Sequence, residues 1–171
     1  ATASAGPLFG GDGSSEVDFS TTSGPARSTA AWSDISPTFF GTLGLPIVRG
    51  RNLAATDRLD SPRVVLVNES LAQRYWPDES PLGKRVTLFD GRMALEVVGV
   101  VRDVRPIIPG APIESQMFWS NRQEPRGFTY VIVRTTVPPA NVVRAVRNRL
   151  AAIDRDLRPG NVRRGTAQAR P

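Results

Sequence analysis

Two pairs of acidic residues are the first candidates for catalysis in this chain of 171 residues. Asp57 and Asp60 lie in a polar stretch, and Asp78 and Glu79 lie in a turn bounded by prolines. Two carboxyl groups can act as the general acid and the general base of a hydrolase when they face one pocket. Both pairs stand in contexts typical of solvated surface loops, however, and the chain has no histidine to serve as the usual base. We therefore expect a protein that is not an enzyme.

Other motifs with known chemistry are incomplete. The glycine-rich stretch at residues 10–15 lacks the spacing and the closing Lys-Ser/Thr of a phosphate-binding loop. Lys84, the single lysine, has no evident serine partner for a catalytic dyad. The chain has no cysteine, no histidine and no acidic cluster with the spacing of a calcium loop. The sequence therefore predicts neither a metal site nor a cofactor.

The basic residues of the chain indicate one alternative function. The formal net charge is +6, and arginine accounts for all but one of the 22 basic residues. A surface that binds nucleic acid needs such residues on one face, together with aromatic side chains that stack on bases. The arginines are scattered, and the candidate aromatic residues fall where a core is expected: Phe39, Phe40, Tyr75, Trp76 and Trp119. A basic nucleic-acid-binding module stays the alternative, with candidate residues on and beyond the last predicted helix: Arg144, Arg147, Arg155, Arg158, Arg163 and Arg164.

Apolar runs and capping residues define the elements that would position these side chains. The continuous apolar run at 64–67 is typical of a buried strand. Asn68 follows it as a favourable N-cap for a helix over 69–75. This capping role outweighs the formal match of Asn68-Glu69-Ser70 to an N-glycosylation acceptor. The asparagine is therefore predicted to be structural.

Alternation of polar and apolar residues predicts most of the remaining strands. Asp90-Gly91 is a strong hairpin signal between strands over 84–89 and 93–101. Further strands are predicted at 17–20, 30–35, 116–120 and 128–134. The longest helix opens at two prolines, and its apolar stripe consists of Val143, Val146, Leu150, Ile153 and Leu157. A hairpin in the middle of the chain and few helices indicate an α+β fold with a mixed sheet.

The segment over residues 35–53 carries dense start and stop signals. Ser36 is a favoured N-cap for a short helix. Gly44 supplies a left-handed stop at its C-terminus, and Pro46 prevents the helix from continuing. Arg49-Gly50-Arg51 comes directly afterwards, without a second phosphate-binding element. We interpret this tripeptide as part of a turn and not as an anion site.

Three ordered stretches carry a family resemblance. They cover residues 36–51, 64–86 and 96–104, and a matching strand at 131–135 precedes a helix that ends at 153–157. In order and spacing, this set resembles the MacB-like extracytoplasmic core domain of FtsX-like ABC transporter permeases, over most of the chain. The residues that carry the match look structural, and they are Ser36, Pro37, Phe40, Leu43, Gly44, Pro46, Gly50, Arg51, Asn68, Tyr75, Pro77, Gly83, Gly99 and Asp103.

This resemblance implies an α+β fold with two lobes. A small α/β lobe would span about residues 30–125, and a porter-like lobe would combine 1–29 with 126–158, which leaves 159–171 as a tail. The domain would be non-enzymatic. It would couple the ATP-driven motion of an efflux or export permease to the handling of a substrate or an adaptor outside the membrane.

The resemblance also implies a location and partners. The domain would lie on the periplasmic side of the bacterial cytoplasmic membrane, attached through flanking helices that the chain lacks. Its partners would be the rest of the permease, an ATPase subunit or domain and a periplasmic adaptor, with no nucleic acid among them. The family domain normally begins with a helix and a strand before the glycine-rich stretch. We therefore expect the chain to be a fragment of a longer permease.

Overall fold

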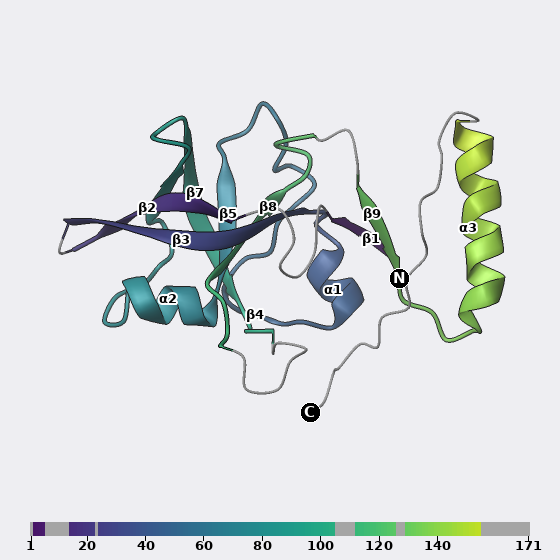
Figure 1. The fold of residues 1–171 in the computed structure, drawn as a ribbon, viewed down its shortest axis with the longest axis horizontal. Helices are drawn as coiled ribbons and strands as arrows, with labels where there is room; N and C mark the ends of the chain where they lie inside the picture. The colour runs from purple at the N-terminus through teal and green to yellow at the C-terminus, as the bar shows by residue number, and fades with distance from the viewer. Residues whose placement is uncertain (1, 6–13, 23, 105–111, 126–128, 155–171) are drawn as a thin grey trace.

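The computed structural model describes residues 2–5, 14–22, 24–104, 112–125 and 129–154 of the chain. Strands and helices are interleaved along these residues (Figure 1). The strands are β1 (Thr2–Ala5), β2 (Ser14–Thr21), β3 (Gly24–Ile35), β4 (Ile47–Gly50), β5 (Val64–Asn68), β6 (Arg85–Leu88), β7 (Met93–Val101), β8 (Gln116–Ser120) and β9 (Tyr130–Val133). The helices are α1 (Phe39–Leu43), α2 (Glu69–Tyr75) and α3 (Pro139–Ile153).

Six of the strands close into a barrel. The sheet runs in the order β2-β6-β7-β5-β8-β3, and β2 also pairs with β3, so that the two ends of this series meet. β3 permits the closure because it pairs with β2 on one side and with β8 on the other, as Ala31 does with Ser14 and Gln116. The pairs β5–β7 and β3–β8 are parallel, whereas the other four pairs of the barrel are antiparallel. This mixed sheet with three described helices confirms the predicted α+β fold.

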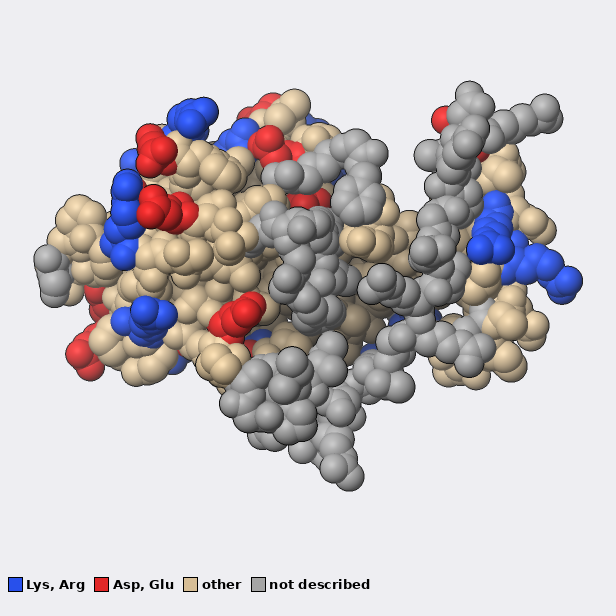
Figure 2. Space-filling view, viewed as in Figure 1, with Lys and Arg blue, Asp and Glu red and all other residues tan. Residues whose placement is uncertain are grey.

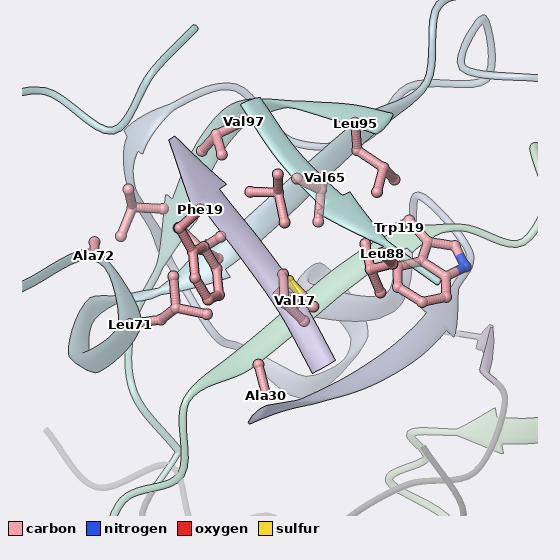
Figure 3. Close-up of a cluster of buried hydrophobic side chains, with 14 of the residues drawn as sticks. Val17, Phe19, Ala30, Val65, Leu71, Ala72, Leu88, Leu95, Val97 and Trp119 are labelled. Carbon is pink, nitrogen blue, oxygen red and sulfur yellow. The ribbon is translucent and has the colours of Figure 1, made fainter. Parts of the chain in front are cut away.

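The barrel encloses the larger of two hydrophobic clusters (Figure 3). On β5, Val65 and Val67 belong to this inner cluster, whereas Val64 and Leu66 belong to the second cluster on the outer face. This alternation follows from the pleat of a strand, which turns successive side chains to opposite faces. All four residues are at most 5% exposed, because both faces of β5 are covered. Burial on both faces explains the continuous apolar run in the sequence.

α2 covers part of the inner cluster with its apolar face. Leu71, Ala72 and Trp76 belong to that cluster, and Figure 3 shows Leu71 and Ala72 near Phe19 of β2. The Phe19 ring stacks on the ring of Tyr75 at a centroid distance of 4.0 Å and meets the ring of Trp76 edge-on at 5.9 Å. These ring contacts hold the helix against the first long strand of the barrel.

The second hydrophobic cluster lies outside the barrel, against α1. Phe39 and Phe40 of this helix are at most 2% exposed, and the Phe40 ring meets the ring of Phe118 edge-on at 5.1 Å. Of the five aromatic residues predicted for the core, four are buried and the fifth, Tyr75, packs against the inner cluster. None of them forms an exposed platform for stacking on bases.

β9 and α3 lie at the end of the molecule opposite α2 (Figure 1). Within the described residues, β9 is the edge of the sheet and pairs with β1. Tyr130 and Val131 on this strand are 48% and 51% exposed. α3 lies beyond β9 and makes no extensive contact with any other described element. Ile153, in its apolar stripe, is 70% exposed.

Most predicted elements are observed with small shifts of their ends. β5, α2, β7 and β8 begin and end within one residue of the prediction. The strand expected at 30–35 begins earlier, at Gly24, because its first half pairs with β2 along the whole length of β2. The strands predicted at 84–89 and 128–134 are shorter than expected. Residues 10–13 of the glycine-rich stretch, Leu157 and the basic residues beyond position 154 lie outside the described residues. The division into two lobes stays a prediction.

The capping prediction for α1 is wrong. The helix begins at Phe39, and Thr38 before it makes no capping hydrogen bond with its side chain. The backbone carbonyl of Ser36 accepts the N–H of Phe39 at 3.0 Å, while the Ser36 hydroxyl lies 3.1 Å from that of Thr38. A backbone turn from Ser36 to Phe39 therefore precedes the helix, and burial of two phenylalanines holds the short helix in place.

Candidate functional site

The segment from α1 to Asp57 carries the densest set of motif residues, and it is built around a left-handed helix end. Gly44 has φ of 75°, and its N–H donates to the carbonyl of Gly41 at 3.3 Å. The N–H of Leu45 donates to the carbonyl of Phe40 at 2.9 Å. Glycine adopts this conformation without the steric penalty that a Cβ brings. The predicted stop at Gly44 is confirmed, and it turns the chain into β4.

Two glycines then allow β4 to pair with β7 at very short range. Gly50 has φ of 71°, and a Cβ on it would lie 2.3 Å from the carbonyl oxygen of Val98. A Cβ on Gly99, its register partner, would lie 2.3 Å from the carbonyl oxygen of Arg51. The N–H of Arg51 donates to the Val98 carbonyl at 3.0 Å. Glycine is therefore required at both positions by backbone contact.

Arg51 forms a bidentate ion pair with Asp57. Its two terminal nitrogens donate to the Asp57 carboxylate at 2.8 Å and 3.0 Å, and the N–H of Ala54 donates to the same group at 2.7 Å. Burial by itself raises the pKa of Asp57, but the hydrogen bonds from Arg51 and Ala54 outweigh it and hold the pKa below 3.8. Arg51 is thus held by an ion pair although its side chain is 49% exposed. Arg49 and Gly50 are the last residues of β4, so the interpretation of these two residues as part of a turn is wrong.

The expectation that Asp57 is a solvated surface residue is wrong, because its side chain is only 8% exposed. Its neighbour Asp60 is 69% exposed and pairs with Arg58 at 2.8 Å. The sequence gives no sign that Arg51 rather than Arg58 pairs with the buried carboxylate, since both lie within a few residues.

The second acidic pair is also occupied by structural contacts. Glu79 forms an ion pair with Lys84 and accepts the N–H of Thr22 at 3.4 Å. The hydrogen bond from Lys84 holds the pKa of Glu79 below its ordinary value. Asp78 beside it is exposed. The two acidic pairs therefore serve separate loops, and none of their residues lines the hollow described below.

Asn68 and Asp103 organise the N-terminus of α2. The Asn68 Oδ1 accepts the N–H of Leu71 at 3.2 Å and the N–H of Gln116 at 3.0 Å. Its Nδ2 donates to the carbonyl of Glu114 at 2.8 Å, and the residue is 1% exposed. Asp103 accepts the Ser70 N–H at 3.0 Å and the Ser70 hydroxyl at 2.6 Å. The predicted cap is confirmed, and Asn68 joins α2 to the segment that enters β8.

The remaining motif residues also have contacts inside the fold. The carbonyl of Pro37 accepts Asn52 Nδ2 at 3.0 Å, and that of Pro46 accepts the N–H of Arg102 at 3.1 Å. Gly83 has φ of 79° and donates its N–H to the carbonyl of Val97 at 2.8 Å. Pro77 directly follows Trp76, the C-cap of α2. These observations place the motif residues at turns, helix ends and close strand contacts. Their assignment as family markers stays a prediction.

A small apolar hollow lies beside α1, and two motif residues, Phe40 and Leu43, line it. It is lined by Ser33, Phe39, Phe40, Leu43, Leu45, Val104, Gln116 and Phe118. It has room for little more than a water-sized group, so it does not suit a ligand of drug size. Within the described residues, no group of three or more acidic side chains lies close enough to hold a metal ion. None of the described helices is long and apolar enough for a bilayer crossing.

One buried contact was not foreseen from the sequence. Trp32 of β3 stacks on Trp119 of β8 at a centroid distance of 4.8 Å, and its Nε1 donates to the hydroxyl of Ser15 at 3.0 Å. The pairing depends on the parallel register of β3 with β8, which joins segments more than 80 residues apart. Local patterns carry no information on such a register.

Comparison with protein-family models identifies the family of this chain. The model of the MacB-like periplasmic core domain matches residues 3–152. The chain belongs to this family. MacB-like periplasmic core domains are parts of ABC transporter permeases and are generally non-catalytic, which agrees with the structural use of both acidic pairs. All the motif residues, from Ser36 to Asp103, lie within the matched range. No curated protein sequence matches the chain at a significant level.

Solved structures show the same MacB-like fold. The periplasmic region of MacB from Actinobacillus actinomycetemcomitans aligns with a TM-score of 0.62 at 20% identity, over 90% of this chain and 66% of that one. A domain of a putative permease from Porphyromonas gingivalis gives 0.59 at 18%, over 91% and 70%. The extracellular domain of the noncanonic ABC-type transporter YknZ from Gram-positive bacteria gives 0.57 at 16%, over 88% and 75%. The chain thus spans just under two thirds of the solved MacB region.

Proposed function

We propose that this chain is the extracytoplasmic part of an FtsX-like ABC transporter permease that works in efflux or export. The match of the family model to residues 3–152 carries this proposal, because it extends from β1 into α3 and therefore includes the whole barrel. The internal use of Arg51, Asp57, Glu79 and Lys84 supports a non-enzymatic role. Nucleotide chemistry belongs to an ATPase subunit or domain on the other side of the membrane.

In this role the barrel acts as a rigid body. Its strands form a closed ring around a packed interior, and such interiors are as dense as crystals of small molecules. A displacement imposed at one end of the domain is therefore transmitted to the other end without deformation. Substrates and a periplasmic adaptor would meet the domain on surfaces that move with this body.

The location is tested by labelling single cysteines, which is clean because the chain has none of its own. In the full-length permease, Leu59→Cys places a thiol at a position that is 68% exposed. We expect a membrane-impermeant maleimide to label it in intact cells. The matched control Val67→Cys, at a position that is 0% exposed, becomes labelled only after denaturation. Labelling of the Leu59→Cys variant only in lysed cells would refute the extracytoplasmic location.

The coupling role is tested by replacing residues 3–152 of the full-length permease with a flexible linker. We expect the assembled transporter to keep its ATP hydrolysis and to lose export, which is measured as growth in a panel of toxic compounds. The matched control carries Leu59→Cys, which leaves the domain in place. Export that survives the replacement would show that the domain does not take part in transport.

A further inference from the structure

The hairpin loop between β6 and β7 has a strained backbone at an exposed position. Three successive residues of this loop have positive φ, with values of 54° at Phe89, 52° at Asp90 and 87° at Gly91. Glycine adopts this region without a steric penalty, whereas a bulky residue such as Phe89 is an outlier there. Strain of this kind is released when a loop rearranges. The loop therefore opposes a local rearrangement at Asp90 less than a relaxed turn would.

Asp90-Gly91 is one of two Asp-Gly pairs in the chain, and its two residues can react with each other. The backbone nitrogen of a glycine can attack Cγ of the aspartate before it, because glycine has no side chain that shields this nitrogen. The Asp90 side chain is 76% exposed, and its ion pair with Arg27 is long, at 3.8 Å. Among the described residues, none accepts a hydrogen bond from the N–H of Gly91. Neither reacting group is therefore held by a short contact within this part of the chain.

Asp60 shows how the fold protects another exposed aspartate. Basic and acidic side chains are interspersed over the barrel, as Figure 2 shows, and Asp60 pairs with Arg58 at 2.8 Å. The N–H of Ser61, which would be the attacking group here, donates to the carbonyl of Arg58 at 2.9 Å. The Asp60 side chain is 69% exposed, close to the value for Asp90. The two sites thus differ in how their reacting groups are held and not in their access to water.

We propose that Asp90-Gly91 is a site of spontaneous aspartate isomerisation in the folded chain. The Gly91 nitrogen forms a bond to Cγ of Asp90 and gives up its proton, which leaves as water with the hydroxyl of the carboxyl group and closes a succinimide ring. Water then adds to the backbone carbonyl carbon of Asp90, and the bond from this carbon to the Gly91 nitrogen breaks. The chain now continues through the side chain, as an isoaspartate of unchanged mass. The reaction needs no oxidant or reductant, and the inference does not depend on the proposed function.

The isoaspartate would change the loop in two ways. Its backbone is longer by one carbon atom, which gives Phe89 room to leave the region of positive φ. Its carboxylate is attached directly to Cα and reaches less far, which removes the contact with Arg27. Arg27 keeps its hydrogen bonds to Asp18 at 2.7 Å and 2.9 Å. The strands stay paired at Leu88 and Met93, because both side chains are buried in the inner cluster.

The first test compares the folded 171-residue chain with the same chain in guanidinium chloride during storage at physiological temperature. Peptide mapping by mass spectrometry, with electron-based fragmentation, distinguishes isoaspartate from aspartate at each site. At Asp90 we expect folding to change the rate by less than about threefold, because no short contact has to open first. At Asp60 we expect folding to slow the reaction by about tenfold or more, because a hydrogen bond and an ion pair have to open first.

The second test uses variants of the loop in the folded chain. Asp90→Glu enlarges the ring that would have to form, so isomerisation at position 90 should fall to background while the other Asp-Gly pair, at 12–13, keeps its rate. Phe89→Asn should slow the reaction at Asp90 by about threefold or more, because asparagine tolerates positive φ and relieves the strain. The matched control Phe89→Leu keeps a bulky side chain and should keep the rate.

Three outcomes would overturn the proposal. The first is the absence of isoaspartate at position 90 after storage of the folded chain. The second is equal slowing of Asp90 and Asp60 on folding, which would mean that the hairpin protects its aspartate as well as the other loop does. The third is an equal rate in Phe89→Asn and Phe89→Leu, because the strained turn would then play no part in the reaction.

Discussion

The barrel and the end formed by β9 and α3 differ in how much of their apolar surface the chain itself covers. Val65 and Val67 at the centre of the barrel are 0% exposed, whereas Val131 of β9 and Ile153 of α3 are 51% and 70% exposed. The barrel is therefore specified by contacts within the described residues. The other end has the patterns of a strand and a helix without the cover that such patterns call for. The two ends should respond differently to mutation, to pH and to hydrogen exchange.

The largest expected effect comes from removing an aromatic ring in the barrel. Phe19→Ala deletes a side chain that is 0% exposed and that contacts the rings of Tyr75 and Trp76. We expect the free energy of unfolding to fall by about 3–5 kcal/mol, because the cavity cannot collapse within a closed ring. Urea denaturation followed by tryptophan fluorescence measures this change. A loss below 1 kcal/mol would show that the inner cluster is loosely packed.

The next effect concerns the close pairing of β4 with β7. Gly99→Ala brings a Cβ within 2.3 Å of a backbone oxygen, so a strand must move, and we expect a loss of about 2–3 kcal/mol. The matched control Gly41→Ala, in α1, meets no atom within 4 Å and should stabilise the chain by about 0.5–1 kcal/mol. Thermal denaturation of both variants measures the difference. Equal changes in stability for the two alanine variants would refute the close backbone contact at Gly99.

A smaller effect is expected from the Arg51–Asp57 ion pair, and it depends on pH. The pKa of Asp57 is lower in the folded chain than in the unfolded chain, so the carboxylate stabilises the fold above about pH 4 and this contribution is lost as the pH falls through the folded-state pKa. Asp57→Asn should therefore reduce the free energy of unfolding by about 1 kcal/mol at pH 7. The difference from the unmodified chain should shrink below pH 4.

The matched control for this pair is Asp60→Asn. That carboxylate is 69% exposed, and exposed ion pairs contribute little to stability. Urea denaturation at pH 3, 5 and 7 measures both variants. A constant difference across this range for Asp57→Asn would contradict the low pKa of the buried carboxylate.

The smallest effect is expected at α3. Val146→Ser removes an apolar group from a helix that makes no extensive contact with another described element, so the free energy of global unfolding should change by less than about 0.5 kcal/mol. Hydrogen exchange monitored by mass spectrometry sharpens the comparison. The amides of α3 should exchange orders of magnitude faster than those of β5. Equal protection of the two elements would show that α3 is docked on the rest of the chain.

Local patterns predicted the elements well where a residue type strongly favours one kind of local structure, such as a helix cap or a turn. Asn68 capped α2 as expected because its side chain can accept the free N–H groups at a helix start. The expected hairpin forms around Asp90 and Gly91, in a loop over residues 89–92 where Phe89 also has φ above 50°. The valines of β5 indicated burial on both faces, and both faces are covered.

Contacts between distant segments were not predictable in this way. Closure of the barrel depends on the pairing of β2 with β6. The alternation of Val17 and Phe19 predicts a strand, but it does not predict which other strand pairs with it. The ion pair of Arg51 with Asp57 depends on the course of the loop between them, which no local pattern specifies. The start of α1, two residues later than predicted, has a similar origin, because burial of Phe39 and Phe40 sets where the helix begins.

Closure of the barrel also sets how this chain can fold. The ring is complete only when β2 meets β6, and the register partners Val17 and Leu88 are about 70 residues apart in the sequence. Ordering so long a loop costs entropy before any contact compensates for it, so folding dominated by such pairings takes milliseconds to seconds. Until that step, β2 and β6 each present an open edge to other chains. A newly synthesised domain is therefore most prone to aggregation before the hairpin of β2 and β3 pairs with β6 and closes the barrel.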